Sequence, residues 1–138
     1  MFLSEQDYWV VIGQKAFEVL SRENEYNLEG AESTAIEEIK GYLQPKYDCS
    51  AIFSAAEEAR NRKIVQITAD IALYHLVSSV PGKMGYEIRK ERYDAAIKWL
   101  EGVQSGKITP DLPLATDDEG NTTTPLRWGS AKRLDNIW

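Results

Sequence analysis

The chain contains 138 residues, of which 43% are hydrophobic and 28% are charged, and it carries a formal net charge of −6. This length fits one compact domain, and the composition excludes both a wholly disordered chain and a fibrous repeat. The excess of acids argues against a general affinity for nucleic-acid phosphate, because such binding depends on Lys and Arg that displace counterions.

The first predicted helix covers residues 4–20. Ser4 has the features of a helix N-cap, because acidic residues follow it in the first turn, where the helix dipole favours negative charge. Apolar residues then recur at three- and four-residue steps up to Leu20, which predicts a helix with one face on a core. Gly13 weakens this helix locally.

The second predicted helix covers residues 28–43, where the apolar residues share one helical face. Pro45 marks its end, because proline cannot continue a helix without the loss of a hydrogen bond. Helical periodicity is lost over residues 47–61, which we interpret as a connection, with or without a short helical turn at 55–60.

The third predicted helix covers residues 64–78 and ends near Pro81. It is apolar over much of its circumference, so it is the best candidate for the central helix. A fourth helix is marked by apolar residues between 93 and 103, with Gly106 as its C-terminal stop. About four helices with short connections predict a small, mainly α-helical bundle, which forms a core domain of residues 1–106.

Residues 107–138 have no helical stripe and are predicted to form an extended C-terminal arm. Either this arm is irregular, or it contains a loose hairpin that turns near Gly120. Residues 109–125 carry too little apolar surface to offset their ordering entropy, so we expect an arm that becomes ordered on docking. The predicted docking residues are Leu126, Arg127, Trp128, Lys132, Arg133, Ile137 and Trp138.

Candidate catalytic and metal-binding residues are few. Cys49 is the only cysteine and His75 the only histidine, which excludes an intrachain disulfide and the usual cysteine and histidine zinc motifs. We expect Cys49 to be a small buried side chain and His75 to pack with its ring hydrogen-bonded. Residues 82–85 lack the spacing of a phosphate-binding loop and predict a turn. No cofactor, metal site or catalytic group is predicted.

The N-terminal segment lacks the basic region and the apolar run of a signal peptide. No stretch approaches the roughly 20 apolar residues that a membrane span requires. We therefore expect a soluble protein that is made in the cytoplasm and has no membrane partner.

The charges are divided between two regions of the chain. Seven acids and one base lie between residues 18 and 38, whereas seven bases and three acids lie between residues 60 and 92. Two interpretations have similar weight: the two surfaces meet between neighbouring subunits, or they neutralise each other within one subunit. The residues assigned to intersubunit charge surfaces are Glu29, Glu32, Glu37, Glu38, Arg89, Lys90 and Arg92.

Five segments of the chain can be compared with known families: MFLSEQDYW at 1–9, DIALYHL at 70–76, IRKERYDAAIKWL at 88–100, GKITPDLPL at 106–114 and RWGS at 127–130. None of them is a mechanistic signature alone, and the specificity comes from their order along almost the full chain. Together they resemble the Mu-type head-tail adaptor, or head-completion, family of tailed bacteriophages. Residues 82–85 and the terminal AKRLDNIW depart from the family pattern.

The resemblance implies a structural virion protein in the neck, at the head-tail interface. It implies a homo-oligomeric ring, twelve-fold in the family, that binds beneath the portal protein, extends the DNA channel and receives the next tail or stopper protein. Packaged DNA would pass through the channel without specific binding, because acids that face the channel repel it. The resemblance brings no reaction and no cofactor, so the chain is predicted not to be an enzyme.

Two other classes of function stay open from the sequence. A helical DNA-binding regulator would use Arg89, Lys90 and Arg92 at the start of the fourth helix, and its binding would depend on salt. A small hydrolase is the less favoured alternative, and it would need one buried carboxylate with a shifted pKa in a cleft. Its candidate carboxylates are Glu37, Glu38, Glu57 and Glu58.

Overall fold

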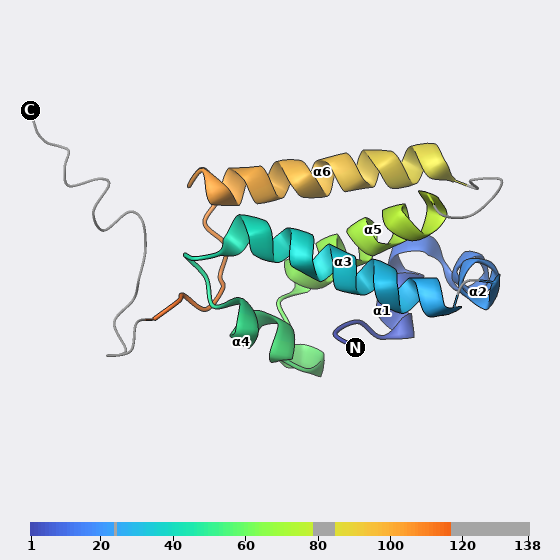
Figure 1. Cartoon of the computed structure of the whole chain (residues 1–138), viewed down its shortest axis with the longest axis horizontal. Helices are drawn as coiled ribbons and strands as arrows, with labels where there is room; N and C mark the ends of the chain where they lie inside the picture. Colours follow the sequence, from blue (N-terminus) through green and yellow to red (C-terminus); the bar gives the residue numbers. More distant parts are fainter. Residues whose placement is uncertain (24, 79–84, 117–138) are drawn as a thin grey trace, which may run out of the picture.

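The computed structural model describes residues 1–23, 25–78 and 85–116 (Figure 1). Residues 82–84 of the turn predicted at 82–85, and the predicted hairpin near Gly120, lie outside these ranges. The described residues form helices and contain no β-strand, which confirms the prediction of a mainly α fold. The elements are α1 (Glu5–Ile12), α2 (Gln14–Glu23), α3 (Glu25–Leu43), α4 (Cys49–Ser54), the 3-10 helix η1 (Glu57–Ala59), α5 (Arg62–Ser78) and α6 (Tyr86–Gln104).

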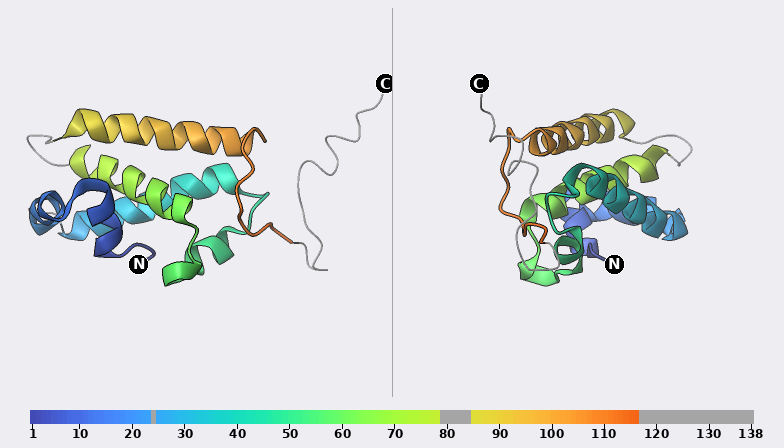
Figure 2. Two further views of the ribbon diagram at one scale, coloured as in Figure 1. Left: turned by 180° about the vertical axis from the view of Figure 1, so that it is seen from behind. Right: turned by 60° about the vertical axis from the view of Figure 1, so that its left-hand side comes forward.

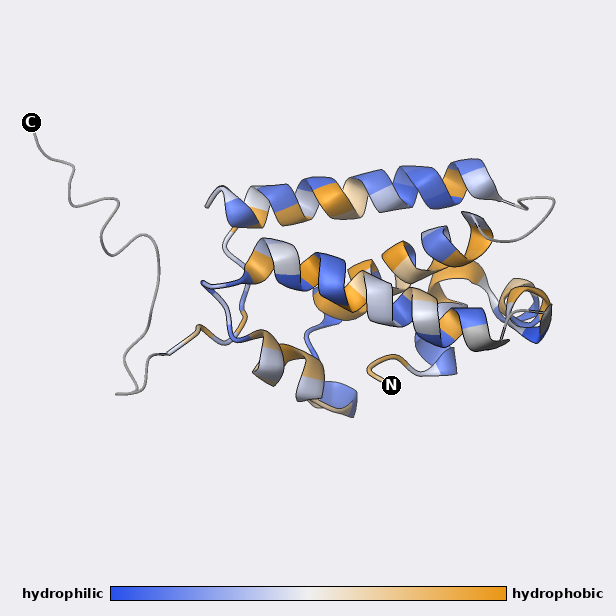
Figure 3. Ribbon diagram, in the orientation of Figure 1, coloured by the Kyte–Doolittle hydropathy of each residue, from blue (hydrophilic) through white to orange (hydrophobic). Residues whose placement is uncertain are grey.

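Helix α5 is the centre of the bundle, as predicted. It packs on α3, α6 and α1, and α3 also contacts α6. Figure 3 shows how apolar residues dominate α5 between its two long neighbours. Its side chains from Ile64 to Leu76 include several with no exposed surface, because the helix is enclosed by other helices on most sides. No described helix combines the length and the apolar character that crossing a membrane requires.

The predicted helix over residues 4–20 is two helices. Ser4 caps α1 as predicted, in a reciprocal arrangement with Asp7. Gly13 then has a φ of 91°, a conformation that other residues rarely adopt, and its N–H donates to the Trp9 carbonyl at 2.8 Å. The chain therefore turns at Gly13, and α2 folds back so that the rings of Tyr8 and Phe17 stack 5.0 Å apart.

Two of the predicted helix boundaries also change. The connection at 47–61 contains α4, whose first turn is capped by the Asp48 carboxylate accepting from the Ala51 N–H at 3.1 Å. Helix α6 begins at Tyr86, before the first apolar residue of its predicted stripe. Its first two turns are mostly charged and carry no apolar stripe, and they include Arg89, Lys90 and Arg92, which are already expected at the start of this helix. Gly106 follows the end of α6 with a φ of 87°, which confirms the predicted stop.

Residues 107–116, which the sequence assigned to the arm, pack on the helical core. The segment runs from the end of α6 past the end of α3 to α4 (Figures 1 and 2). Ile108 lies so close to Gly102 that a Cβ there would come within 2.6 Å of it. Leu112 is buried, and the N–H of Asp48 donates to the Pro113 carbonyl at 2.9 Å. The packed part of the chain therefore extends beyond the predicted boundary at residue 107.

Candidate functional site

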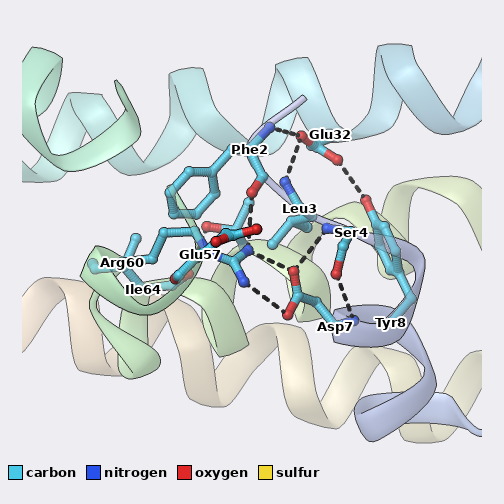
Figure 4. A network of polar contacts seen from close by, with 10 residues as sticks. Phe2, Leu3, Ser4, Asp7, Tyr8, Glu32, Glu57, Arg60 and Ile64 are labelled. Atoms are coloured by element: carbon cyan, nitrogen blue, oxygen red, sulfur yellow. Dashed lines mark hydrogen bonds and ion pairs between the residues drawn. The ribbon is translucent and has the colours of Figure 1, made fainter. Parts of the chain in front are cut away.

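The first polar cluster lies around the N-terminal segment and is shown in Figure 4. We name it the N-terminal anchor; it consists of the backbone of residues 2–4 with the side chains of Asp7, Tyr8, Glu32 and Arg60. Glu32 of α3 is its buried acceptor, with 2% of its surface exposed. Its Oε2 accepts from the N–H groups of residues 2 and 3 at 3.0 and 3.3 Å, and its Oε1 accepts from the Tyr8 hydroxyl at 3.0 Å.

Asp7 and Arg60 form the second half of the anchor. The Arg60 guanidinium donates to both carboxylate oxygens of Asp7, at 2.6 and 3.3 Å, and to the Phe2 carbonyl at 3.0 Å. The Ser4 N–H donates to the same carboxylate at 2.7 Å. Burial opposes ionisation, but these hydrogen bonds outweigh it and hold the pKa of Asp7 below its ordinary value. The anchor therefore ties the N-terminal segment to α3 and to the connection between η1 and α5.

A second cluster joins α5 to α6 through Asp70, Arg89 and Arg92. Arg92 donates to both oxygens of the buried Asp70 carboxylate, at 2.7 and 3.2 Å. Arg89 is also buried, but its Nη1 lies 4.0 Å from the nearest Asp70 oxygen and has no hydrogen-bond partner among the described residues. Burial raises the pKa of Asp70 and lowers that of Arg89, since each loses the hydration of its charge.

A third cluster joins α3, α5 and α6 through half-buried side chains. His75 Nε2 lies 2.6 Å from Glu38 Oε1, and the Tyr93 hydroxyl donates to Glu38 Oε2 at 3.1 Å. The ring of Tyr93 stacks on Tyr74 with a centroid distance of 4.3 Å. His75 thus packs with its ring hydrogen-bonded, as expected. Cys49 is buried as expected, and burial raises the pKa of its thiol.

The structure corrects the predicted charge surfaces at two residues. Glu32 and Arg89 are buried, so the prediction that places them on a surface is wrong for both. Glu38 and Arg92 are partly exposed, but their charged groups are bound within the chain. Arg92 binds Asp70, an acid of its own region, and Glu38 binds His75 and Tyr93, so the two interpretations of the charged regions both stay predictions.

The remaining predicted surface charges are exposed. Glu29 and Glu37 lie on α3, and Lys90 lies on α6, where its Nζ is 3.0 Å from the Asp94 carboxylate one turn later. Contact of these three residues with a neighbouring subunit stays a prediction. The predicted docking residues lie outside the described part of the chain: Leu126, Arg127, Trp128, Lys132, Arg133, Ile137 and Trp138.

The sequence-based predictions did not include the N-terminal anchor, although the sequence contains an indication of one member, Glu32. Glu32 lies four residues after Leu28 and three before Ala35, so it is in phase with the apolar stripe of α3. A charged residue in that phase indicates a buried acceptor. No comparable signal identifies Arg60, whose partner Asp7 is 53 residues away in sequence. Across the residues that the structure places, no group of three or more His, Cys, Asp or Glu side chains could hold a metal ion.

A protein-family model described as "Bacteriophage Mu, Gp36" matches residues 3–126 of the chain. The matched range includes all the helices and the segment that packs on α4. No curated protein and no solved structure matches the chain significantly.

Proposed function

Because the chain belongs to the bacteriophage Mu Gp36 family, we propose that it is a structural virion protein that acts as a head-tail connector adaptor. In this role it forms a homo-oligomeric ring beneath the portal, extends the DNA channel and receives the next tail or stopper protein. The proposal includes a location in the virion neck and no catalytic activity. Its C-terminal docking residues, Trp128 among them, attach the ring to the portal or to a neighbouring subunit.

The observation that carries this proposal is the extent of the family match, which spans residues 3–126 and therefore the whole packed bundle. The bundle supports it through three buried or half-buried polar clusters that connect α1, α3, α5 and α6. A subunit of a ring needs helices that keep their mutual positions, and such connections favour this. The exposed acids Glu29 and Glu37 would let DNA pass without adhering if α3 faces the channel.

The alternative of a DNA-binding regulator is weakened by the positions of its arginines. Arg89 is buried and Arg92 is bound to Asp70, which leaves Lys90 as the exposed member of that trio. Lys90 is itself paired with Asp94. Phosphate binding gains its free energy from several exposed cations that displace counterions, so this helix start is a poor contact for a duplex.

The alternative of a carboxylate hydrolase fits its proposed residues less well. Glu37, Glu57 and Glu58 are exposed, whereas an acid catalyst of this kind needs a carboxyl group in a low-dielectric cleft. Glu38 is occupied by His75 and Tyr93. We therefore favour the adaptor over both alternatives.

The test is the mass of the purified chain, alone and mixed with the portal protein of the same phage, by analytical ultracentrifugation and electron microscopy. We expect a ring that caps the portal, either preformed or assembled on it. The Trp128→Ala variant should lose most of this binding, because a buried interface tryptophan contributes ~2 kcal/mol or more. A chain that stays monomeric and does not bind the portal contradicts the proposal, as does salt-dependent duplex binding by the free chain.

A further inference from the structure

A wide groove lies between the N-terminal segment and the end of α4, where the chain continues into η1 (Figure 1). Its volume is about 1150 Å³. Apolar side chains from both sides meet in it, since the half-buried rings of Phe2 and Phe53 are in edge-to-face contact with their centroids 5.0 Å apart. Met1, in the same lining, is 71% exposed. The groove therefore presents apolar surface to solvent.

The rim of this groove carries two glutamates without a bound cation. Glu57 and Glu58 line the groove and are exposed, and neither forms an ion pair with another described residue. Arg60 belongs to the same lining, but its charge is bound to Asp7. Arg62 is left to offset one of the two glutamates. The groove thus combines apolar side chains with a small excess of negative charge at its rim.

The opposite end of α4 has a small excess of positive charge. Lys46 lies just before the helix, and Lys40 is close enough to Cys49 to act on its thiol. The acid at this end is Asp48, whose carboxylate caps α4. Helix α4 itself, with the sequence CSAIFS, has no charged side chain. The surface along α4 therefore passes from positive, through uncharged, to negative.

The departing chain carries the complementary order of charges. It leaves the described part of the protein at Thr116, which lines the same small pocket as Ser50 in the first turn of α4. Residues 117–119 are all acidic, residues 120–126 are uncharged, and Arg127 follows. A chain that runs along α4 toward the groove would therefore meet opposite charges at both ends of the helix.

The length of this stretch also fits. Residues 117–125 span at most about 32 Å when extended, whereas the six residues of α4 have a length of about 9 Å. In extended backbone, Leu126 and Trp128 lie on one side and Arg127 on the other. Two apolar side chains can then enter the groove while the arginine stays at its rim. Residues 126–128 therefore match the groove in both reach and chemistry.

The short tether favours the groove of the same subunit over that of another copy. A short linker gives a segment of the same chain an effective concentration on the order of millimolar, which exceeds that of a second copy in dilute solution. Two other grooves lie farther from the point of departure. The groove that Phe17 lines is on the α2 side of the N-terminal segment, and the one that Ile88 lines is at the far end of α6 (Figure 1).

We propose that the groove beside α4 binds residues 126–128 of the same chain in the free subunit. Trp128 packs against Phe2 and Phe53, and Arg127 pairs with the glutamates at the rim. The contact itself does not depend on the proposed function. Its consequence for assembly does, because a portal or a neighbouring subunit that binds Trp128 must first displace it from the groove.

The test is an intrachain disulfide in the full-length protein. Ala56→Cys places a thiol in the groove, and Gly129→Cys places one next to Trp128. Under mild oxidation the doubly substituted chain should form a link between positions 56 and 129, identified by peptide mass spectrometry, with a yield that does not change on dilution. The native Cys49 is buried and its thiol pKa is raised, so it is a poor competitor.

The matched control combines Gly129→Cys with Ala95→Cys, which is exposed on α6 and away from the groove. This pairing should lose most of the link, and adding Trp128→Ala to the first pairing should reduce its yield. Equal yields from the two pairings would overturn the proposal. A link between positions 56 and 129 that occurs only in covalent dimers would also overturn it, since the segment would then occupy another copy.

A second measurement covers the case in which a cysteine variant does not fold. A fluorescent peptide of residues 122–138 is titrated with the full-length Trp128→Ala variant, whose own segment should leave the groove accessible. The peptide should bind this variant about tenfold or more tightly than it binds the unsubstituted chain, in which the docked segment competes. Equal binding to the two chains, or no binding to either, would contradict the proposal.

Charge reversal at the rim identifies the groove as the site of this binding. In the Trp128→Ala background, Glu57→Lys together with Glu58→Lys should abolish binding of the peptide. Glu87→Lys together with Glu91→Lys changes the same charge at exposed positions of α6 and should leave binding intact. Equal losses in the two double variants would mean that the peptide responds to net charge alone, which overturns the proposal. No portal is present in these measurements, so their outcome is separate from that of the proposed function.

Discussion

Two buried carboxylates, Asp7 in the N-terminal anchor and Asp70 between α5 and α6, are each bound by an arginine but differ in their surroundings. Arg60 and the Ser4 N–H surround Asp7 with donors, and its pKa is below the ordinary value. Asp70 is also bound through both oxygens, yet burial dominates and raises its pKa. The balance between lost hydration and gained hydrogen bonds therefore differs between two ion pairs of similar appearance.

The two regions also differ in whether every charged group has a hydrogen-bond partner. In the N-terminal anchor, the charged groups of Asp7, Glu32 and Arg60 all have hydrogen-bond partners within the chain. Near Asp70, the nearby Arg89 keeps a donor without a partner among the described residues. The hydrogen bonds of the first region should stabilise the subunit more than the long contact of Arg89 does. Substitutions in the two regions should therefore differ in how far they lower the free energy of unfolding.

The largest expected effect on stability comes from Arg60→Met. The substitution keeps much of the apolar stem but leaves the buried Asp7 carboxylate and the Phe2 carbonyl without their donor. Removing one partner of a buried ion pair costs about 3 kcal/mol or more, so the free energy of unfolding in urea should fall by this amount. Arg62→Met, two residues away and exposed, is the control and should change it little.

The second effect in size is expected from Glu32→Gln. An amide has one acceptor oxygen in place of two, so it cannot accept both from the N-terminal backbone and from the Tyr8 hydroxyl as the carboxylate does. We expect a loss of about 2 kcal/mol in the free energy of unfolding, together with faster hydrogen exchange at the amides of residues 2 and 3. Glu29→Gln, exposed on the same helix, should leave both unchanged. Equal effects of the two substitutions would contradict the anchor.

Arg89→Met should have a smaller effect on the isolated subunit, and this result would sharpen the contrast between the two regions. Arg92 keeps its two hydrogen bonds to Asp70, while the substitution removes only a longer 4.0 Å contact and an unpartnered donor. We expect a change below about 1 kcal/mol in urea unfolding. A loss as large as that of Arg60→Met would mean that Arg89 is a structural residue of the single subunit.

The regular parts of the fold could be predicted from the sequence. The cap at Ser4, the stop at Gly106 and the central α5 all follow from local residue preferences and apolar periodicity. The break at Gly13 was underestimated, because its effect depends on the packing of α2 back against α1. Such long-range packing is not encoded in a local pattern.

The candidate sites were less predictable, because residue type was given more weight than helical phase. Arg89 lies seven residues before Ala96 and fourteen before Val103, so it shares the buried face of α6. Assigning it to a surface from its charge ignored that phase. Pairs such as Asp7 with Arg60 depend on chain segments that meet only in three dimensions. A single sequence therefore indicates that Glu32 and Arg89 lie on buried faces but not which groups they contact.

The smallest expected effect is on the pH dependence of stability, where the two carboxylates should act with opposite signs. The pKa of Asp7 is lower in the folded than in the unfolded state, so its stabilisation is present above the ordinary value of 3.8 and is lost as pH falls through the folded pKa. The pKa of Asp70 is raised, so the folded state binds the proton more readily above 3.8 and stability falls as pH rises through that window. Urea unfolding between pH 2 and 6 measures both. Asp7→Asn should make the increase of stability from low pH less steep, Asp70→Asn should make it steeper, and Asp111→Asn, an exposed control, should leave it unchanged. If Asp7→Asn and Asp70→Asn shift the curve in the same direction, the two carboxylates do not differ in the balance of burial and hydrogen bonding. The opposite pKa shifts assigned to them would then be wrong.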